Sequence, residues 1–208
     1  MIVSIAVLLL IVLSVFFRSI SEKEQARKAA EAAEAAEALL PPGIEEKFLE
    51  PNEFSRPGTA LTEVHGVVVH YTANPGTGAA ANRNYFNNLP EINSKKKNKT
   101  YASSHYVIGI DGEIIQCIPL NEIAYASNDR NVDTISIECC HKRKSGKFTN
   151  ATYRSLVQLT AYLCKKYQLT EQNVIRHYDV TEKICPKYFV EHEDAWQAFK
   201  AEVAAKLV

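Results

Sequence analysis

The pattern of apolar and polar residues divides this chain into three parts. Residues 2–17 form an apolar run interrupted only by two serines, and residues 21–40 are rich in Ala, Glu and Lys. Short β-branched runs begin near residue 66. The first two parts predict helices, whereas the third predicts strands mixed with amphipathic helices.

The third part resolves into short elements. Strands are expected over residues 66–72, 105–110, 113–118, 134–139 and 174–177, and helices over residues 79–89, 149–167 and 194–207. Asp111-Gly112 indicates a hairpin with a two-residue turn, and Thr149 is a plausible N-cap. Strands that alternate irregularly with helices predict an α/β fold, with a mixed central β-sheet flanked by helices.

The first forty residues predict an apolar helix followed by a helical stalk. The run reaches the roughly 20 residues that a membrane crossing needs only if Ile20 is included. No Lys or Arg precedes it, and a weak cleavage site follows it, so an anchor is favoured over a cleaved signal peptide or a buried core helix. The predicted parts are therefore a membrane anchor or signal segment (1–20), a helical linker ended by Pro41-Pro42-Gly43 (21–44) and a globular domain (45–208).

Composition removes one class of function. The formal net charge is zero, without the basic excess of a nucleic-acid binder, so nucleic acid is not an expected partner. The five cysteines are odd in number and two are adjacent, which is a poor basis for a disulfide framework. Cys117 and Cys164 are expected in the core, whereas Cys185 lies in a polar loop before a proline.

Three residues at strand ends or next to them could bind a metal. His70 and His177 each end a predicted strand, and Cys185 follows eight residues after His177. Imidazole nitrogen and thiolate sulfur are ligands for zinc, and catalytic zinc sites keep three protein ligands. Spacing alone does not bring His70 to the other two, and each histidine taken singly is more often an ordinary hydrogen-bonded residue.

Seven motifs in order connect most of the chain to a known family. They are NEFSRPG (52–58), VHYTANPG (69–76), NRNYF (82–86), SSHYV (103–107), IQCIP (115–119), SIE (136–138) and RHYDVTEKICP (176–186). Through them the chain resembles the zinc amidases of the N-acetylmuramoyl-L-alanine amidase type, the group shared by phage endolysins and peptidoglycan recognition proteins. The resemblance implies a mixed sheet flanked by helices, with Zn²⁺ held by His70, His177 and Cys185.

The same resemblance implies a reaction and its groups. It predicts hydrolysis of the amide between N-acetylmuramic acid and L-alanine in peptidoglycan, with Glu138 as general base and Lys183 stabilising the oxyanion. Some phage relatives carry a catalytic tyrosine where this chain has Ser104, which favours a mechanism based on the glutamate. His105 is predicted to contact the substrate, with a histidine satisfied in the core as the alternative.

Two other functions stay open at this point. One is a peptidoglycan-binding module of the same fold without activity, which is disfavoured because Glu138 and Cys185 are present. The other is a zinc amidase for a different N-acyl peptide. The proposed substrate places the domain outside the cell membrane, or secreted after cleavage, although the basic residues that follow the apolar run favour the opposite orientation.

Several further residues carry weaker expectations. Asp179 is expected to cap its own loop, and His65, His141 and His192 are expected at the surface. Two basic runs, residues 95–99 and 142–147, are expected to be solvated loops.

Overall fold

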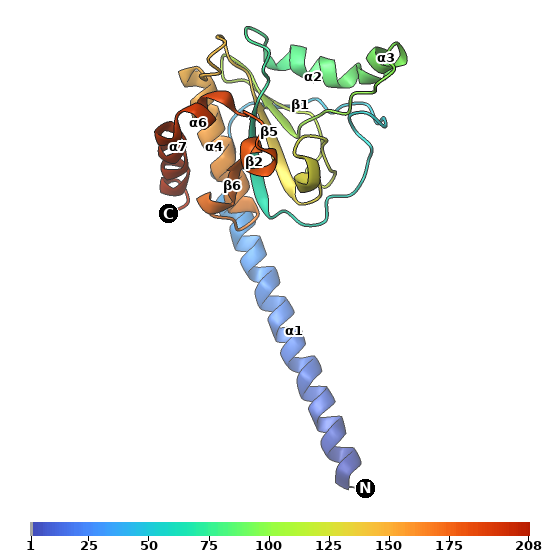
Figure 1. Ribbon diagram of the computed structural model, residues 1–208. Helices are drawn as coiled ribbons and strands as arrows, with labels where there is room; N and C mark the ends of the chain where they lie inside the picture. The colour runs from blue at the N-terminus through green and yellow to red at the C-terminus, as the bar shows by residue number, and fades with distance from the viewer. Residues whose placement is uncertain (1) are drawn as a thin grey trace.

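A long helix leads into a layered domain (Figure 1). The computed structural model describes the backbone of residues 2–208, and the side chains of residues 2–14, 33 and 36 lie outside what it describes. The strands are β1 (Ile44–Glu46), β2 (Gly66–Tyr71), β3 (Tyr106–Ile108), β4 (Ile114–Gln116), β5 (Thr134–Cys139) and β6 (Val174–Arg176). The α-helices are α1 (Ile2–Glu37), α2 (Ala79–Asn87), α3 (Leu89–Ser94), α4 (Asn150–Lys166), α5 (His177–Thr181), α6 (Lys187–Glu191) and α7 (Glu193–Ala205). Two short 3₁₀ helices are η1 (Asn128–Val132) and η2 (Glu171–Asn173).

The strands form one mixed sheet in the order β1-β4-β3-β5-β2-β6. Only β3 and β4 pair antiparallel, while the other neighbouring pairs are parallel. The predicted α/β class and the mixed sheet are therefore confirmed. Strand β1 has no counterpart in the prediction, because its sequence Ile-Glu-Glu is short and polar, as an edge strand can be.

Alternation along the central strands separates a packed face from a face with polar groups. Val67 and Val69 of β2 and Ile135 and Ile137 of β5 lie in the large apolar cluster that contains residues of α4 and α7. The intervening side chains point to the opposite face, because successive residues of a strand alternate. Figure 1 shows α4 and α7 next to each other on one side of the sheet. This arrangement leaves the other face available for polar chemistry.

Local signals account for the best-predicted elements. Thr149 caps α4, and its side chain accepts a hydrogen bond from the Thr152 backbone N–H. The hairpin is confirmed, but its turn is longer than predicted: the Gly109 N–H donates to the Glu113 carbonyl, so the loop has three residues and ends at Gly112 with a φ of 91°. A positive φ at that position is what this loop length requires and what glycine tolerates.

Three further features differ from the predicted pattern. The apolar helix and the helical stalk are one continuous helix, because α1 runs through Ser21 without a break. β6 ends at Arg176, and His177 begins α5 instead of ending the strand. His141 is buried rather than on the surface, with its ring stacked on Tyr71.

Three expectations about single residues are confirmed. Cys117 and Cys164 are buried in the two apolar clusters. Asp179 accepts a hydrogen bond from the Arg176 backbone N–H and so caps its own segment.

The described part of α1 is a charged, solvent-exposed helix. Arg27 pairs with Glu24 and Glu31 at 2.8 and 3.0 Å, and similar pairs three or four residues apart occur along the same stretch. Such pairs each add a few tenths of a kcal/mol to an isolated helix. Among the side chains that the structure describes, no helix is long and apolar enough to cross a membrane. The predicted anchor is residues 1–20, and most of their side chains are outside what the structure describes.

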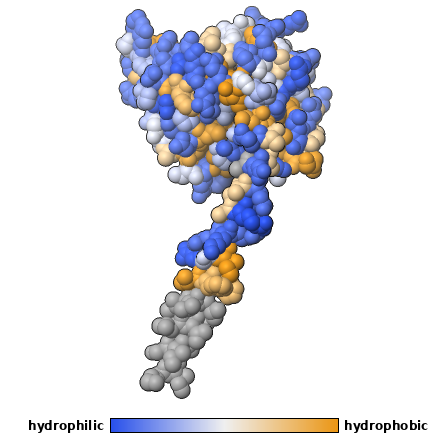
Figure 2. Space-filling view, turned by 180° about the vertical axis from the view of Figure 1, so that it is seen from behind, coloured by the Kyte–Doolittle hydropathy of each residue, from blue (hydrophilic) through white to orange (hydrophobic). Residues whose placement is uncertain are grey.

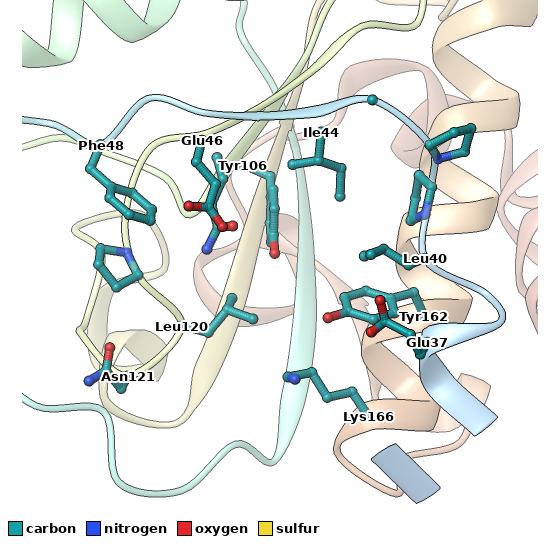
Figure 3. A pocket seen from close by; sticks show the side chains of 15 residues that line it. Glu37, Leu40, Ile44, Glu46, Phe48, Tyr106, Leu120, Asn121, Tyr162 and Lys166 are labelled. Carbon is teal, nitrogen blue, oxygen red and sulfur yellow. The ribbon is translucent and has the colours of Figure 1, made fainter. Parts of the chain in front are cut away.

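The end of α1 borders a large hollow on the domain. It has a volume of about 690 Å³ and lies between the chain segment from Glu37 to Phe48, the edge of the sheet and Tyr162 and Lys166 of α4 (Figure 3). It contains neither of the predicted histidine ligands nor Cys185.

His105 supports the sheet from inside the protein. It is 1% exposed, its Nε2 lies 2.9 Å from the Glu122 carbonyl oxygen, and its Nδ1 accepts the Ser136 backbone N–H at 3.0 Å. Both ring nitrogens are therefore used within the protein, and no part of the ring faces a cleft. The predicted contact of His105 with substrate is therefore wrong, and the alternative, a histidine whose hydrogen bonds are satisfied in the core, is what the structure has.

Burial of His105 makes the fold sensitive to acid. Burial lowers the pKa of this imidazole to about 4, so the unfolded chain binds the proton more tightly than the folded chain does. The stability that depends on a neutral His105 is complete above pH 6.5 and is lost as the pH falls toward 4. We expect His105→Gln to shrink the difference in unfolding free energy between pH 7 and pH 4.5 by about 2–3 kcal/mol. Urea titrations at both pH values measure it, with the exposed His65→Gln as the control. An unchanged difference in His105→Gln would contradict the assignment.

Candidate metal centre and cleft

Strand register places the first two functional side chains together. β2 and β5 are parallel neighbours, and His70 is the register partner of Glu138. Both alternate with the apolar residues that face α4, so both point to the opposite face of the sheet. They lie near the carboxyl ends of their strands, the edge at which open α/β sheets commonly bind ligands.

His177 and Cys185 are positioned by the neighbouring strand β6 and the loop that follows it. β6 pairs with β2 on its other side, with Arg176 opposite Val69, so that His177 follows at the level of His70. The rings of His70 and His177 have centroids 4.7 Å apart at an angle of 55°. The Tyr178 N–H donates to the Cys185 carbonyl at 2.8 Å, which closes the loop between them and returns Cys185 to the start of α5.

The structure brings the three predicted ligands into one buried cluster. One ligand atom from each of His70, His177 and Cys185 lies within 4.8 Å of the others. Cys185 Sγ and His70 Nδ1 are 3.8 Å apart. Metal–ligand bonds of about 2.0–2.3 Å in a tetrahedron need ligand atoms roughly 3.3–3.6 Å apart, so this pair fits closely and the widest pair must approach by roughly 1 Å. Two imidazoles and a thiol are a donor set that suits zinc.

Electrostatics of the cluster favour neutral imidazoles. Burial, reinforced by the neighbouring His177 and by Lys183, keeps the pKa of His70 well below its usual value. Burial and then Lys183 also lower the pKa of His177. Burial and the nearby Glu138 raise the pKa of the Cys185 thiol to about 12, whereas a thiol that coordinates a metal loses its proton. The histidines are thus ready to act as ligands, and the thiol becomes one when a cation is present.

Glu138 is the buried acid beside this cluster. Burial raises the pKa of its carboxyl to about 7, and the positive charge of Lys183 offsets part of that rise. Its Oε2 is buried without a hydrogen-bond partner among the described residues. An unpaired buried carboxyl oxygen costs stability, which is typical of a group kept for binding or catalysis.

A cleft of about 390 Å³ opens over these groups. Glu138, His70, His177 and Cys185 line it together with Lys183, an exposed residue of the loop before Cys185. Its walls also include the side chains of Phe86, Tyr101, Tyr125, Asn128 and Asn131. His105 does not line it, and Ser104 is fully buried, with its hydroxyl bonded to the Tyr106 and Ser136 carbonyls.

Sequence reasoning missed the loop that faces the two histidines. Ser127 Oγ lies 3.2 Å from His70 Nε2, and Asn128 Oδ1 lies 3.2 Å from His177 Nε2. Neither residue belongs to any of the seven motifs, and a serine or asparagine in a polar loop gives no signal of its own.

Comparison with known proteins points to one enzyme family. A family model described as N-acetylmuramoyl-L-alanine amidase matches residues 60–188. The N-acetylmuramoyl-L-alanine amidase CwlL of Bacillus licheniformis is 35% identical to this chain, over 79% of the chain and 47% of that protein. The chain spans about half the length of the curated relatives it matches.

Solved structures share the fold. The catalytic domain of XlyA matches with a TM-score of 0.63 and 31% identity, over 77% of this chain and 98% of that structure. PlyL matches with a TM-score of 0.64 and 25% identity, over 79% of this chain and 99% of that structure. Because the family model matches more than half of the chain and includes every residue of the cluster, this chain belongs to the N-acetylmuramoyl-L-alanine amidase family.

Proposed function

We propose that the domain is a zinc-dependent hydrolase of the amide between N-acetylmuramic acid and L-alanine in bacterial peptidoglycan. The observation that carries the proposal is the convergence of His70, His177 and Cys185 beside a buried Glu138 at the floor of one cleft. Membership of the amidase family supports the type of bond and the substrate.

Each group then has a chemical task. His70, His177 and Cys185 would hold a zinc ion, which would supply a Lewis acid for the amide carbonyl and lower the pKa of bound water. Glu138 takes the proton from the attacking water at its unpaired oxygen and delivers it to the leaving nitrogen, for which a pKa of about 7 is well matched. The Lys183 ammonium stabilises negative charge that develops on the carbonyl oxygen. Aromatic side chains of the cleft, such as Tyr101 and Tyr125, hold the substrate and exclude water.

Metal dependence tests the proposal directly. Purified full chain is incubated with peptidoglycan, and the new amino groups of L-alanine are counted with and without a chelator. We expect turnover to fall to background after chelation and to return with stoichiometric Zn²⁺, because the proposed reaction needs the metal that His70, His177 and Cys185 would hold. The Cys185→Ala variant should stay inactive after the same addition of Zn²⁺, because it lacks one of the three ligands.

Three outcomes separate the candidate functions in that assay. Binding to peptidoglycan without any product indicates a non-catalytic module of the same fold. Release from other N-acyl peptides but not from peptidoglycan indicates a different amidase. Turnover that resists thorough metal removal would overturn the zinc-dependent reaction.

Variants in the cleft test the two proposed catalytic residues. We expect Glu138→Gln to lower kcat by about 10²–10⁴ while the bound zinc is retained, because the amide keeps the shape but cannot take a proton. Lys183→Met should lower kcat by about 10² through weaker stabilisation of the oxyanion. Lys187→Met is the matched control, since Lys187 pairs with Glu191 away from the cleft. Full kcat in Glu138→Gln, with zinc content measured on the same samples, rules out this choice of base.

We also propose that the N-terminal apolar run tethers the domain to the outer side of the cell membrane. The described end of that run and Ile20 just after it support a tether: Val15, Phe16, Phe17 and Ile20 are 49–65% exposed, and a hydrophilic stretch separates them from the domain (Figure 2). Exposed apolar side chains of this size are costly in water and favourable in a bilayer.

Fractionation of cells tests the tether. We expect the full chain in the membrane fraction, sensitive to protease added outside, and a chain without residues 1–20 in the soluble fraction. Mass spectrometry of the mature N-terminus distinguishes an uncleaved anchor from a cleaved signal segment. Protection from external protease in intact spheroplasts would place the domain on the other side and contradict the proposal.

A further inference from the structure

Two consecutive residues face the two histidines of the cluster from one short segment. Ser127 contacts Nε2 of His70 and Asn128 contacts Nε2 of His177, both at 3.2 Å. The two contacts therefore use the same nitrogen of each ring. On His70 the other nitrogen, Nδ1, faces Cys185 Sγ.

The segment itself is held rigidly. Asn131 Oδ1 accepts the backbone N–H groups of Ala126 and Ser127 at 3.0 and 2.6 Å, and the Arg130 N–H donates to the Ser127 carbonyl. Ser127 is 1% exposed, and Asn128 has a φ of 52°, a conformation that asparagine and glycine tolerate best. The backbone that carries the two contacting side chains is thus held by the segment's own hydrogen bonds.

The chemistry of the two contacting oxygens bears on which ring nitrogen carries the proton. An amide oxygen only accepts hydrogen bonds, so the Asn128 contact requires the proton of neutral His177 on Nε2. The Ser127 hydroxyl can donate or accept, and it accepts from His70 Nε2 when that ring adopts the same tautomer. Each ring then has its lone pair on Nδ1, and a metal binds only to a nitrogen with a free lone pair.

We propose that Ser127 and Asn128 are positioning residues that fix the Nε2–H tautomer of His70 and His177, so that both rings present Nδ1 to the metal. The biological purpose of this positioning rests on the proposed zinc-dependent function, whereas the tautomers themselves can be measured without any reaction. Because one segment orients both ligands, the two histidines depend on the same short stretch of backbone.

Nitrogen-15 NMR of the histidine rings tests the tautomers in the metal-free full chain. We expect both rings to be protonated at Nε2. Ser127→Ala should shift His70 toward a mixture of tautomers and leave His177 unchanged, and Asn128→Gly should do the reverse. Glycine is chosen because it keeps the positive φ while it removes the acceptor. Ser127→Thr and Asn128→Asp retain an acceptor and should preserve the tautomers.

Zinc affinity gives a second readout that needs no substrate. In competition with a chromophoric chelator, Ser127→Ala and Asn128→Gly should each bind Zn²⁺ about 10- to 100-fold more weakly, as is typical when the partner of a ligand is lost. Ser104→Ala is the control, since this buried hydroxyl bonds to backbone carbonyls and contacts neither histidine. Thermal unfolding of the same samples verifies that each variant is folded.

Two results would overturn the inference. One is a proton on Nδ1 of either histidine in the unmodified chain, which needs no variant to be stable. The other is unchanged tautomers and zinc affinity in both Ser127→Ala and Asn128→Gly. A failure of amidase activity leaves these readouts intact, so the positioning role and the proposed reaction fail separately.

Discussion

The parallel pairing of β2 with β5 is the constraint on which the rest of the site depends. It places His70 directly opposite Glu138, and alternation along both strands turns these two side chains away from the apolar face under α4. A shift of one residue in that register would exchange the faces and bury the apolar side chains on the wrong side. The packing of the core and the geometry of the site are therefore set by the same hydrogen-bonded ladder.

The site gains its reactivity by giving up some stability. Glu138 is a buried carboxyl with an unpaired oxygen, and the two histidines and the thiol crowd together with few partners of their own. Such groups oppose folding unless a ligand satisfies them. The opposite face compensates with continuous apolar packing by α4, α6 and α7, which includes stacked rings of Phe189, Trp196 and Phe199. Binding of a cation would then contribute to the fold as well as to the chemistry.

Elements with a local cause could be predicted from the sequence, whereas features set by distant neighbours could not. The Thr149 cap and the periodicity of α4 are read within a few residues, and so is the β-branched run of β2. The order of the strands is not local, so only the family resemblance could join His70 to Cys185. His105 and His141 carry no mark of burial in their own sequence, because the groups that cover them come from other segments: the Glu122 carbonyl contacts His105, and Tyr71 stacks on His141. Ser127 and Asn128 could not be predicted for the same reason, because the histidines that they contact lie far away in the sequence.

Helix α1 has a consequence for where the domain could act. Its 36 residues correspond to about 54 Å, of which roughly 26 Å follow residue 20. With residues 2–20 in a bilayer, a stiff spacer of this kind would hold the cleft within a narrow range of distances from the membrane surface. A flexible chain would set only the largest distance. Cutting would then be confined to a thin layer of polymer near the membrane, and each added helical turn would raise that layer by about 5 Å.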